Sequence, residues 1–209
     1  MHLPQPVRVK ICGLTNLEDA LFAACEGADA LGFVFYKGSP RYIDPGAAAG
    51  IIRMLPPFAT PVGVFVDEGE SVVRDAIKSG IRVLQFHGSE PPEYCRSFGL
   101  PYVKAFRVRN MESVDGVEAY DDATAYLLDT YSEKEFGGTG TAFNWDVAIY
   151  AKSHGRIVLA GGLTPENIAE AVRVVRPYAV DVSSGVEAEK GKKDHAKVRA
   201  FIRAAKGMA

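Results

Sequence analysis

Residues 157–186 read IVLAGGLTPENIAEAVRVVRPYAVDVSSGV. In this segment an apolar β-branched run, a Gly-Gly turn, an Ala-rich helical stretch and a second apolar run follow one another. This order is typical of two parallel strands joined by a helix, because a parallel connection needs a long crossover. The same alternation continues toward the N-terminus, so the segment predicts an α/β fold.

Eight short apolar runs alternate with eight helical stretches along the 209 residues. The predicted strands are Val7–Ile11, Ala30–Phe35, Pro61–Val66, Val83–Phe86, Tyr102–Arg107, Ala125–Asp129, Ile157–Ala160 and Ala179–Val182. The predicted helices are Leu17–Glu26, Pro45–Met54, Ser71–Ser79, Pro91–Phe98, Met111–Tyr120, Phe143–Ser153, Glu166–Val174 and Lys193–Ala205. Eight units favour a closed (β/α)8 TIM barrel over an open doubly wound sheet. We therefore expect residues 1–209 to form a single-domain barrel with short loops.

The composition is that of an ordinary globular protein, with 47% hydrophobic residues, 24% charged residues and a formal net charge of −2. So small a charge provides no field that would attract nucleic acid or anionic lipid, and we expect neither as a partner. Three scattered cysteines and an N-terminus with two prolines and no apolar run predict a cytoplasmic protein. The sequence contains no metal-binding motif and no apolar stretch of membrane-spanning length. Whether the chain is a monomer or a homodimer is left open.

The first predicted strand leads into a cysteine at the end where a barrel carries its active site. Alternation from Val7 onward puts Lys10 and Cys12 on the inner face, with Cys12 at the mouth. An ammonium beside a thiol favours the thiolate, so we expect Lys10 to promote ionisation of Cys12 as a base or nucleophile. An inert buried cysteine is the alternative, and the pattern alone does not decide between the two.

The sixth predicted strand ends in Asp129, which alternation places on the same face as Ala125 and Leu127. The first and sixth strands lie on roughly opposite sides of an eight-stranded ring. Cys12 and Asp129 are therefore expected to flank a substrate as a base and an acid. A helix-capping or loop-stabilising aspartate is the alternative interpretation.

Two glycine-containing turns follow the seventh and eighth strands, where this fold commonly binds phosphate. The predicted phosphate-binding residues are Gly161, Gly162, Ser183, Ser184 and Gly185. Glycines let the backbone approach a ligand, and successive N–H groups can surround an anion. A pair of ordinary tight turns is the alternative.

Three more side chains are candidates for substrate binding. Arg41 lies in the loop after the second strand, where its planar guanidinium could hold a carboxylate, although a solvated surface arginine is the alternative. His87 follows the fourth strand, and Asp181 lies in the eighth. The three glycines within Glu135–Thr141, after the sixth strand, suggest a flap that closes over the substrate.

A series of short motifs occurs in order at the ends of the predicted strands. They are Lys10-Ile11-Cys12-Gly13-Leu14-Thr15, Gly32-Phe33-Val34-Phe35, Ser39-Pro40-Arg41-Tyr42, Gln85-Phe86-His87-Gly88, Leu128-Asp129, Gly137-Gly138-Thr139-Gly140, Ala160-Gly161-Gly162-Leu163 and Asp181-Val182-Ser183-Ser184-Gly185-Val186-Glu187. Together they resemble the phosphoribosylanthranilate isomerase family of tryptophan biosynthesis across almost the whole chain. Asn144-Trp145 stands where the family has Asp-Trp, and residues 189–191 lack a proline, but neither departure touches Cys12 or Asp129.

The resemblance implies an enzyme that performs an Amadori rearrangement of N-(5-phosphoribosyl)anthranilate, a small phosphorylated substrate, without a cofactor. It implies that Cys12 is the general base, Asp129 the general acid and Arg41 the group that holds the anthranilate moiety. The seventh and eighth loops would bind the phosphate. Another sugar-phosphate isomerase or epimerase, or a barrel that binds a phosphorylated ligand without turnover, are the alternative functions.

Overall fold

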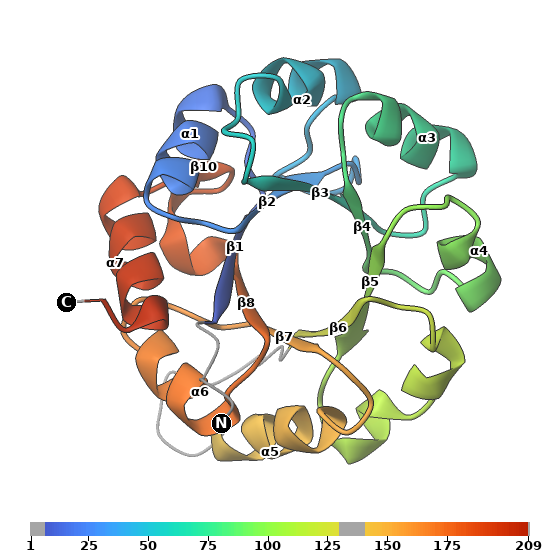
Figure 1. Ribbon diagram of the computed structural model, residues 1–209, viewed down its shortest axis with the longest axis vertical. Coiled ribbons are helices and arrows are strands. Elements are labelled where there is room, and N and C mark those ends of the chain that lie inside the picture. Colours follow the sequence, from blue (N-terminus) through green and yellow to red (C-terminus); the bar gives the residue numbers. More distant parts are fainter. Residues whose placement is uncertain (1–6, 130–140, 209) are drawn as a thin grey trace.

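The computed structural model describes residues 7–129 and 141–208, with the backbone alone for residues 141–144. Eight parallel strands form a closed barrel, in which each strand pairs with its sequence neighbours and the eighth pairs with the first. Figure 1 looks down this barrel, with the strands as a central ring and the helices around it. The predicted (β/α)8 TIM barrel is therefore confirmed.

The eight strands differ from their predicted limits by at most one residue at either end. They are β1 Arg8–Cys12, β2 Ala30–Val34, β3 Thr60–Phe65, β4 Val83–Phe86, β5 Tyr102–Arg107, β6 Ala125–Asp129, β7 Ile157–Ala160 and β8 Ala179–Val182. The α-helices are α1 Leu17–Cys25, α2 Pro45–Ile52, α3 Glu70–Lys78, α4 Pro92–Arg96, α5 Thr141–Ala151, α6 Ile168–Val175 and α7 His195–Lys206. None of the helices in the described part of the chain has the length and apolar character needed to cross a bilayer.

Side-chain alternation along the strands separates the outer core from the barrel interior. Val9 and Ile11 are fully buried in the large core that includes helix residues. The interior is packed by small and medium side chains, which are Ala105, Ala125, Leu127, Val158, Ala160 and Ala179. Cys12 packs with Val34 and Val64 in a separate cluster, which also lies on the inner faces of the strands. The inward orientation predicted for Cys12 follows from this packing.

The α-helix predicted at Met111–Tyr120 is wrong, because this segment does not form an α-helix. The structure has two short 3₁₀ helices there, η1 Met111–Val114 and η2 Val117–Tyr120. Between them Asp115 is extended, with ψ of 136°, and Gly116 has φ of +83°. A helix cannot continue through an extended residue followed by a left-handed one, so the Asp-Gly pair divides the segment.

Helix α6 begins at Ile168, two residues after its predicted start at Glu166. Thr164 Oγ1 accepts a hydrogen bond from the N–H of Glu166, as expected of a capping side chain before a proline. Residues 165–167 then form a hydrogen-bonded turn before the helix begins. Asn167 holds this turn by accepting from Thr164 N–H and donating to the carbonyl of Gly162.

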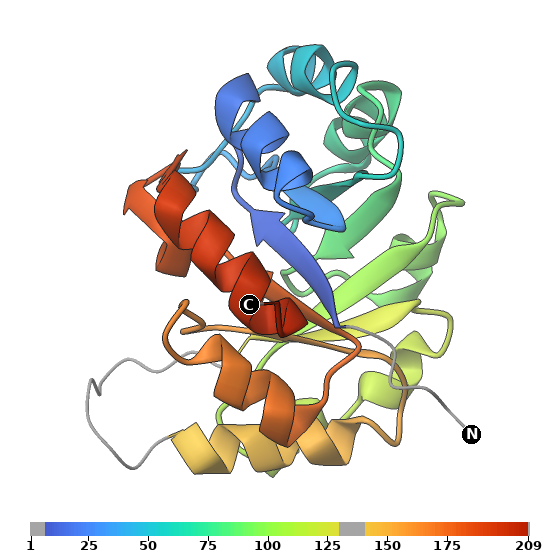
Figure 2. The same cartoon turned by 60° about the vertical axis from the view of Figure 1, so that its left-hand side comes forward.

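A two-stranded hairpin, β9 Glu187–Glu189 with β10 Lys192–Lys193, lies between the barrel and the last helix. The hairpin was not predicted from the sequence. The predicted last helix begins at Lys193, whereas α7 begins at His195 with Asp194 as its N-cap. In Figure 2, α7 (red) lies beside α1 (blue), so the last helix packs on the first. The hairpin is thereby held next to the loops that follow β1 and β2.

Candidate active site

The β1 side of the barrel mouth is built around Cys12, which is 7% exposed. One layer beneath it, Lys10 Nζ lies 2.9 Å from Oδ1 of Asp181, its register partner on β8. Burial lowers the pKa of Lys10 more than any other single influence, yet the charges and hydrogen bonds of Asp181 and Cys12 together raise it above its usual value. Lys10 is therefore held as an ammonium ion beneath the thiol.

The effect of Lys10 on the thiol of Cys12 is in the expected direction, but it does not set the overall shift of the pKa. Burial raises its pKa most, the charge of Asp181 raises it further, and Lys10 lowers it without reversing the direction. The expected effect of Lys10 is thus present, but desolvation of the thiolate is larger. The raised pKa favours the protonated thiol in the unliganded protein.

Glycine at position 32 makes room for this arrangement. Gly32 is the register partner of Cys12 on β2. A Cβ atom at this position would lie 2.8 Å from Cys12 Sγ and 3.2 Å from Lys10 Cε. Any side chain here would have to displace the thiol or the lysine, so Gly32 is a site residue that the sequence analysis did not assign.

The opposite side of the mouth carries Asp129 at the end of β6, with its side chain 27% exposed. Its Oδ2 lies 3.2 Å from Nε2 of His87, the residue that follows β4. The other ring nitrogen of His87, Nδ1, lies 3.1 Å from Nε2 of Gln85. The structure therefore brings the predicted acid and His87 together, and adds Gln85 beneath them.

A buried ion pair holds the chain directly after His87. Glu90 and Lys104 lie 2.8 Å apart, with side chains 2% and 3% exposed. Glu90 also accepts hydrogen bonds from the N–H groups of Gly88 and Asp67, and Lys104 donates to the carbonyl of Gly88. These contacts join the loops after β3 and β4, so the backbone that carries His87 is fixed from two strands.

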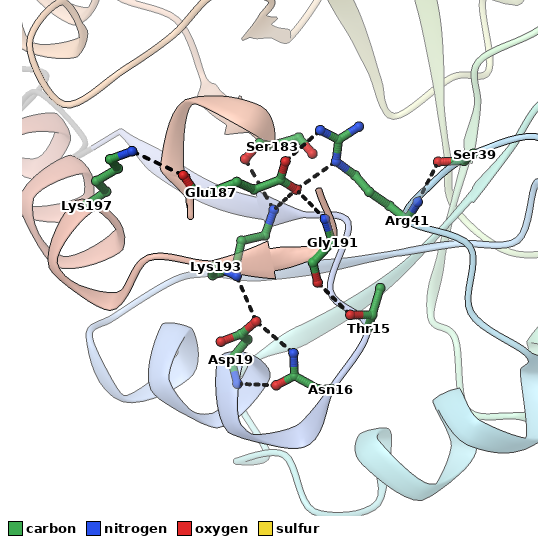
Figure 3. A network of polar contacts seen from close by, with 10 residues as sticks. All are labelled: Thr15, Asn16, Asp19, Ser39, Arg41, Ser183, Glu187, Gly191, Lys193 and Lys197. Atoms are coloured by element: carbon green, nitrogen blue, oxygen red, sulfur yellow. Dashed lines mark hydrogen bonds and ion pairs between the residues drawn. The ribbon is translucent and has the colours of Figure 1, made fainter. Parts of the chain in front are cut away.

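Arg41 is not a solvated surface arginine. Its guanidinium makes a two-point contact with Glu187, with Nε 2.7 Å from Oε1 and a terminal nitrogen 2.6 Å from Oε2. Lys193 lies on the same carboxylate at 3.0 Å and also donates to the carbonyl of Ser183. Figure 3 shows Glu187 between the two cations, with Gly191 beside it.

This network has one carboxylate for two cations, and burial and the mutual contacts together shift the pKa values of all three groups. Burial is the largest influence on the pKa of Glu187 and raises it, but the hydrogen bonds and charges of Arg41 and Lys193 lower it overall. Burial lowers the pKa of Lys193 even though Glu187 opposes the change. The hydrogen bond with Glu187 raises the pKa of Arg41. The cluster therefore keeps a positive charge beside the mouth.

Glu187 and Lys193 were absent from the sequence-based site. Glu187 stands in one of the quoted motifs, but its partner Arg41 is 146 positions away in the chain. No local spacing connects them, because the barrel closure brings the second and eighth loops together. The hairpin also contacts the loop after β1, where the hydroxyl of Thr15 donates to the carbonyl of Gly191 at 2.6 Å.

The predicted phosphate loops have the backbone that their glycines suggested. Gly161 and Gly162 have φ of +83° and +63°, which favours glycine at both positions. A Cβ at Gly185 would lie 1.9 Å from the carbonyl oxygen of Leu163, so the two loops touch at a point where only glycine fits. Ser184 begins a short 3₁₀ turn after β8.

Ser183 contributes a buried hydroxyl that lies near Arg41 as well as near the phosphate loops. Its Oγ is the one buried side-chain polar atom without a hydrogen-bond partner in the described part of the chain. A Cβ at Gly13 would lie 3.1 Å from Ser183 Oγ and 2.5 Å from Arg41 Cδ, so both side chains cover the Gly13 backbone. An unpaired buried hydroxyl is costly unless a ligand completes it.

The mouth thus brings together most of the residues singled out from the sequence, although Asp181 contacts Lys10 beneath the mouth. The glycine-rich segment Glu135–Thr141, expected to form a flap, lies outside the described residues except for the backbone of Thr141. Among the residues that are described, no group of three or more His, Cys, Asp and Glu side chains is arranged to hold a metal ion.

Comparison with known proteins places these features in a family. A family model described as N-(5'phosphoribosyl)anthranilate (PRA) isomerase matches residues 9–204. The N-(5'-phosphoribosyl)anthranilate isomerase of Geobacter sulfurreducens is 56% identical over 202 residues, covering 96% of this chain and 99% of the relative. That of Citrifermentans bemidjiense is 57% identical over 203 residues, covering 97% and 98%.

Solved structures agree. Phosphoribosyl anthranilate isomerase from Thermotoga maritima superposes with a TM-score of 0.88 at 48% identity, covering 97% of this chain and all of that one. A phosphoribosyl anthranilate isomerase in complex with reduced 1-(o-carboxyphenylamino)-1-deoxyribulose 5-phosphate superposes with a TM-score of 0.87 at 46% identity, with coverage of 97% and 100%. A third structure contains monomers generated from the dimeric Thermotoga maritima enzyme, with a TM-score of 0.85 at 45% identity and coverage of 97% and 100%.

Proposed function

Because this chain belongs to the family of N-(5'-phosphoribosyl)anthranilate isomerases, we propose that it converts N-(5-phosphoribosyl)anthranilate into 1-(2-carboxyphenylamino)-1-deoxyribulose 5-phosphate. The observation that carries this proposal is the pair of inward-facing groups at the mouth, a thiol at the end of β1 and a carboxyl at the end of β6. An Amadori rearrangement needs one acid and one base, and a barrel mouth can hold them on two sides of a sugar.

Asp129 is the proposed acid. It protonates the furanose ring oxygen, the C1–O bond breaks, and the lone pair of the anthranilate nitrogen forms the C=N bond of a protonated imine. The partial exposure of Asp129 lets its carboxyl group reach a ligand at the mouth. General acid catalysis of this kind contributes roughly 10² to 10⁴ in rate.

Cys12 is the proposed base that removes the proton on C2 of the opened sugar. The electrons of the C2–H bond then flow into the imine and give an enolamine, which becomes the ketone after proton transfer to C1. The thiol has a raised pKa in the unliganded protein, so it needs positive charge to ionise. Lys10 supplies one such charge and the protonated imine supplies a second, and nearby cations favour a thiolate.

Binding of the substrate is assigned to two anion sites. We propose that Arg41 holds the aryl carboxylate, because its cluster with Glu187 and Lys193 keeps a net positive charge at the mouth. The phosphate is assigned to the loops containing Gly161, Gly162 and the Ser183–Gly185 turn, whose glycine backbone lets a ligand approach closely. Phosphate contacts far from the reacting carbons help to position them.

His87 and Asp181, predicted from the sequence as substrate-binding residues, have protein partners in the structure. His87 contacts Asp129, and Asp181 contacts Lys10. We infer that His87 influences the substrate through Asp129, and that Asp181 does so through Lys10 and Cys12.

All residues given a role here come from one barrel, so a monomer and a homodimer should both be active. Light scattering, with an activity assay on each species, tests this prediction.

The direct test is the fluorescence of freshly generated phosphoribosylanthranilate mixed with the purified protein. The proposal predicts rapid loss of the substrate signal and formation of the ribulose product, identified by mass spectrometry after borohydride reduction. Decay at the spontaneous rate contradicts the proposal. Saturable binding of the reduced product without turnover would instead favour a phosphate-binding barrel, and turnover of a different sugar phosphate would favour another isomerase or epimerase.

A further inference from the structure

Gln85 is a buried polar residue of the barrel interior that the proposed reaction leaves without a role, and its amide lies against His87. We propose that Gln85, acting through His87, is a positioning residue that keeps the acid proton of Asp129 on the carboxyl oxygen that His87 does not contact. This inference rests on the proposed function, because it assigns the way in which the acid of that reaction is prepared.

The three residues form a line from the barrel interior to the mouth. Alternation on β4 points Val83 and Gln85 inward, where both line a cavity of the barrel, and continues to His87 at the mouth. Gln85 is 1% exposed. Its Nε2 lies 3.1 Å from Nδ1 of His87, and His87 Nε2 lies 3.2 Å from Asp129 Oδ2.

The amide of Gln85 favours hydrogen on one ring nitrogen of His87 over the other. An amide nitrogen can only donate, so the contact requires an unprotonated Nδ1 that accepts. The hydrogen of a neutral imidazole then lies on Nε2, which donates to Oδ2 of Asp129. Each contact in the line has one donor and one acceptor, so this tautomer satisfies all of them.

The tautomer in turn determines where a protonated Asp129 holds its proton. Oδ2 already accepts from His87, so the acid proton lies on Oδ1, where the substrate can take it. With the opposite tautomer, the lone pair of Nε2 would attract the proton to Oδ2 and hold it between Asp129 and His87. When the Oδ1–H bond breaks in the ring-opening step, the carboxylate that forms still accepts from His87, which stabilises it.

Glutamate at position 85 separates this role from packing, since it keeps the shape of glutamine but only accepts when ionised. In Gln85→Glu the carboxylate holds a hydrogen on Nδ1 of His87, which either reverses the tautomer or protonates the ring. In Gln85→Leu the donor is lost, but Asp129 still favours hydrogen on Nε2. We therefore expect Gln85→Glu to be the more damaging variant, whereas a packing role predicts that leucine is at least as damaging.

Nitrogen-15 NMR of histidine-labelled protein reads the tautomer directly, because protonated and unprotonated ring nitrogens resonate far apart. The sequence has four histidines, so His87→Asn assigns the signal of interest. The wild-type protein should show His87 with Nδ1 unprotonated and Nε2 protonated, and Gln85→Glu should show a protonated Nδ1. A protonated Nδ1 in the wild type overturns the inference, whether or not either variant folds.

Kinetics with the fluorescent substrate complete the test. We expect kcat of Gln85→Glu to fall about tenfold to a hundredfold with KM little changed, which is at or below the low end of the effect of losing a general acid. Val83→Ala, on the same strand face but away from His87, is the matched control for a loosened interior and should keep most of kcat. An unchanged kcat in Gln85→Glu, or a larger loss in Gln85→Leu, contradicts the inference. Absence of isomerase activity in the wild type would instead reject the proposed function, while the NMR result would stand.

Discussion

The two sides of the barrel mouth prepare their reactive groups in opposite ways. On the β1 side, Cys12 is 7% exposed and lies above a buried Lys10–Asp181 ion pair. On the β6 side, the side chain of Asp129 is 27% exposed and forms a hydrogen bond with His87. Burial and charge therefore control the thiol, whereas hydrogen-bond direction controls the carboxyl group.

This difference suits the order of events in the proposed reaction. The acid acts first, on a neutral sugar ring, and needs a proton that is accessible as soon as the substrate binds. The base acts second, after ring opening has produced a cationic imine. A thiol that stays protonated until positive charge develops nearby becomes a base at that step.

Together with the loss of Cys12, the largest effect is expected from Asp129→Asn, which removes the proposed acid but keeps a similar side-chain shape. The asparagine amide cannot protonate the ring oxygen, so kcat should fall by roughly 10² to 10⁴. KM should change little, since the anion sites lie elsewhere. Steady-state kinetics on the fluorescent substrate measure both, and a wild-type kcat would place the acid on another residue.

A smaller effect is expected from Gly32→Ala, which disturbs the base without removing it. The new Cβ would lie 2.8 Å from Cys12 Sγ, so the thiol must move away from its position. Misplacement of a reacting group by about 1 Å can cost 10²-fold, and we expect a tenfold to hundredfold loss in kcat. Gly50→Ala is the matched control, because a Cβ there meets nothing within 4 Å. Equal activity of the two variants would contradict the proposed role of Gly32.

The smallest effect is a shift in pH dependence that sharpens the contrast between the two sides. Since burial raises the pKa of Cys12, kcat/KM should increase with pH along an alkaline limb. Lys10 lowers this pKa and Asp181 raises it, so Lys10→Met should move the limb to higher pH and Asp181→Asn to lower pH. A pH profile of kcat/KM for the three proteins measures the shifts, and movement of both variants in one direction would show that the limb does not report the thiol.

The barrel could be predicted because its signals are local. Each strand is a short apolar run, and alternation within β1 placed Cys12 on the inner face, where it packs with Val34 and Val64. On β6, Leu127, which shares a strand face with Asp129, packs in the barrel interior. The predicted helix at residues 111–120 failed because Asp115-Gly116 breaks it, and the apolar pattern of the segment outweighed this turn signal in the prediction.

Only the part of the candidate site that lies at strand ends, or in the loops directly after them, could be predicted from the sequence. Arg41 was predicted from its place after the second strand, but Glu187 and Lys193 come from a hairpin that reaches Arg41 only when the barrel closes. The net shift in the pKa of Cys12 could not be predicted for a related reason. Lys10 is visible as a neighbour in the sequence, whereas the depth of burial and the opposing charge of Asp181 depend on the complete barrel.

The proposed role of Cys12 is tested by the turnover of phosphoribosylanthranilate by Cys12→Ala beside the wild type and Cys25→Ala. Cys25 is an exposed cysteine on α1 and serves as the matched control. We expect rapid loss of substrate fluorescence with the wild type and Cys25→Ala. With Cys12→Ala the rate should be lower by roughly 10² to 10⁴, although this variant should still bind the reduced product. A near-normal kcat for Cys12→Ala would contradict the proposed role of Cys12, because the base would then lie elsewhere in the barrel.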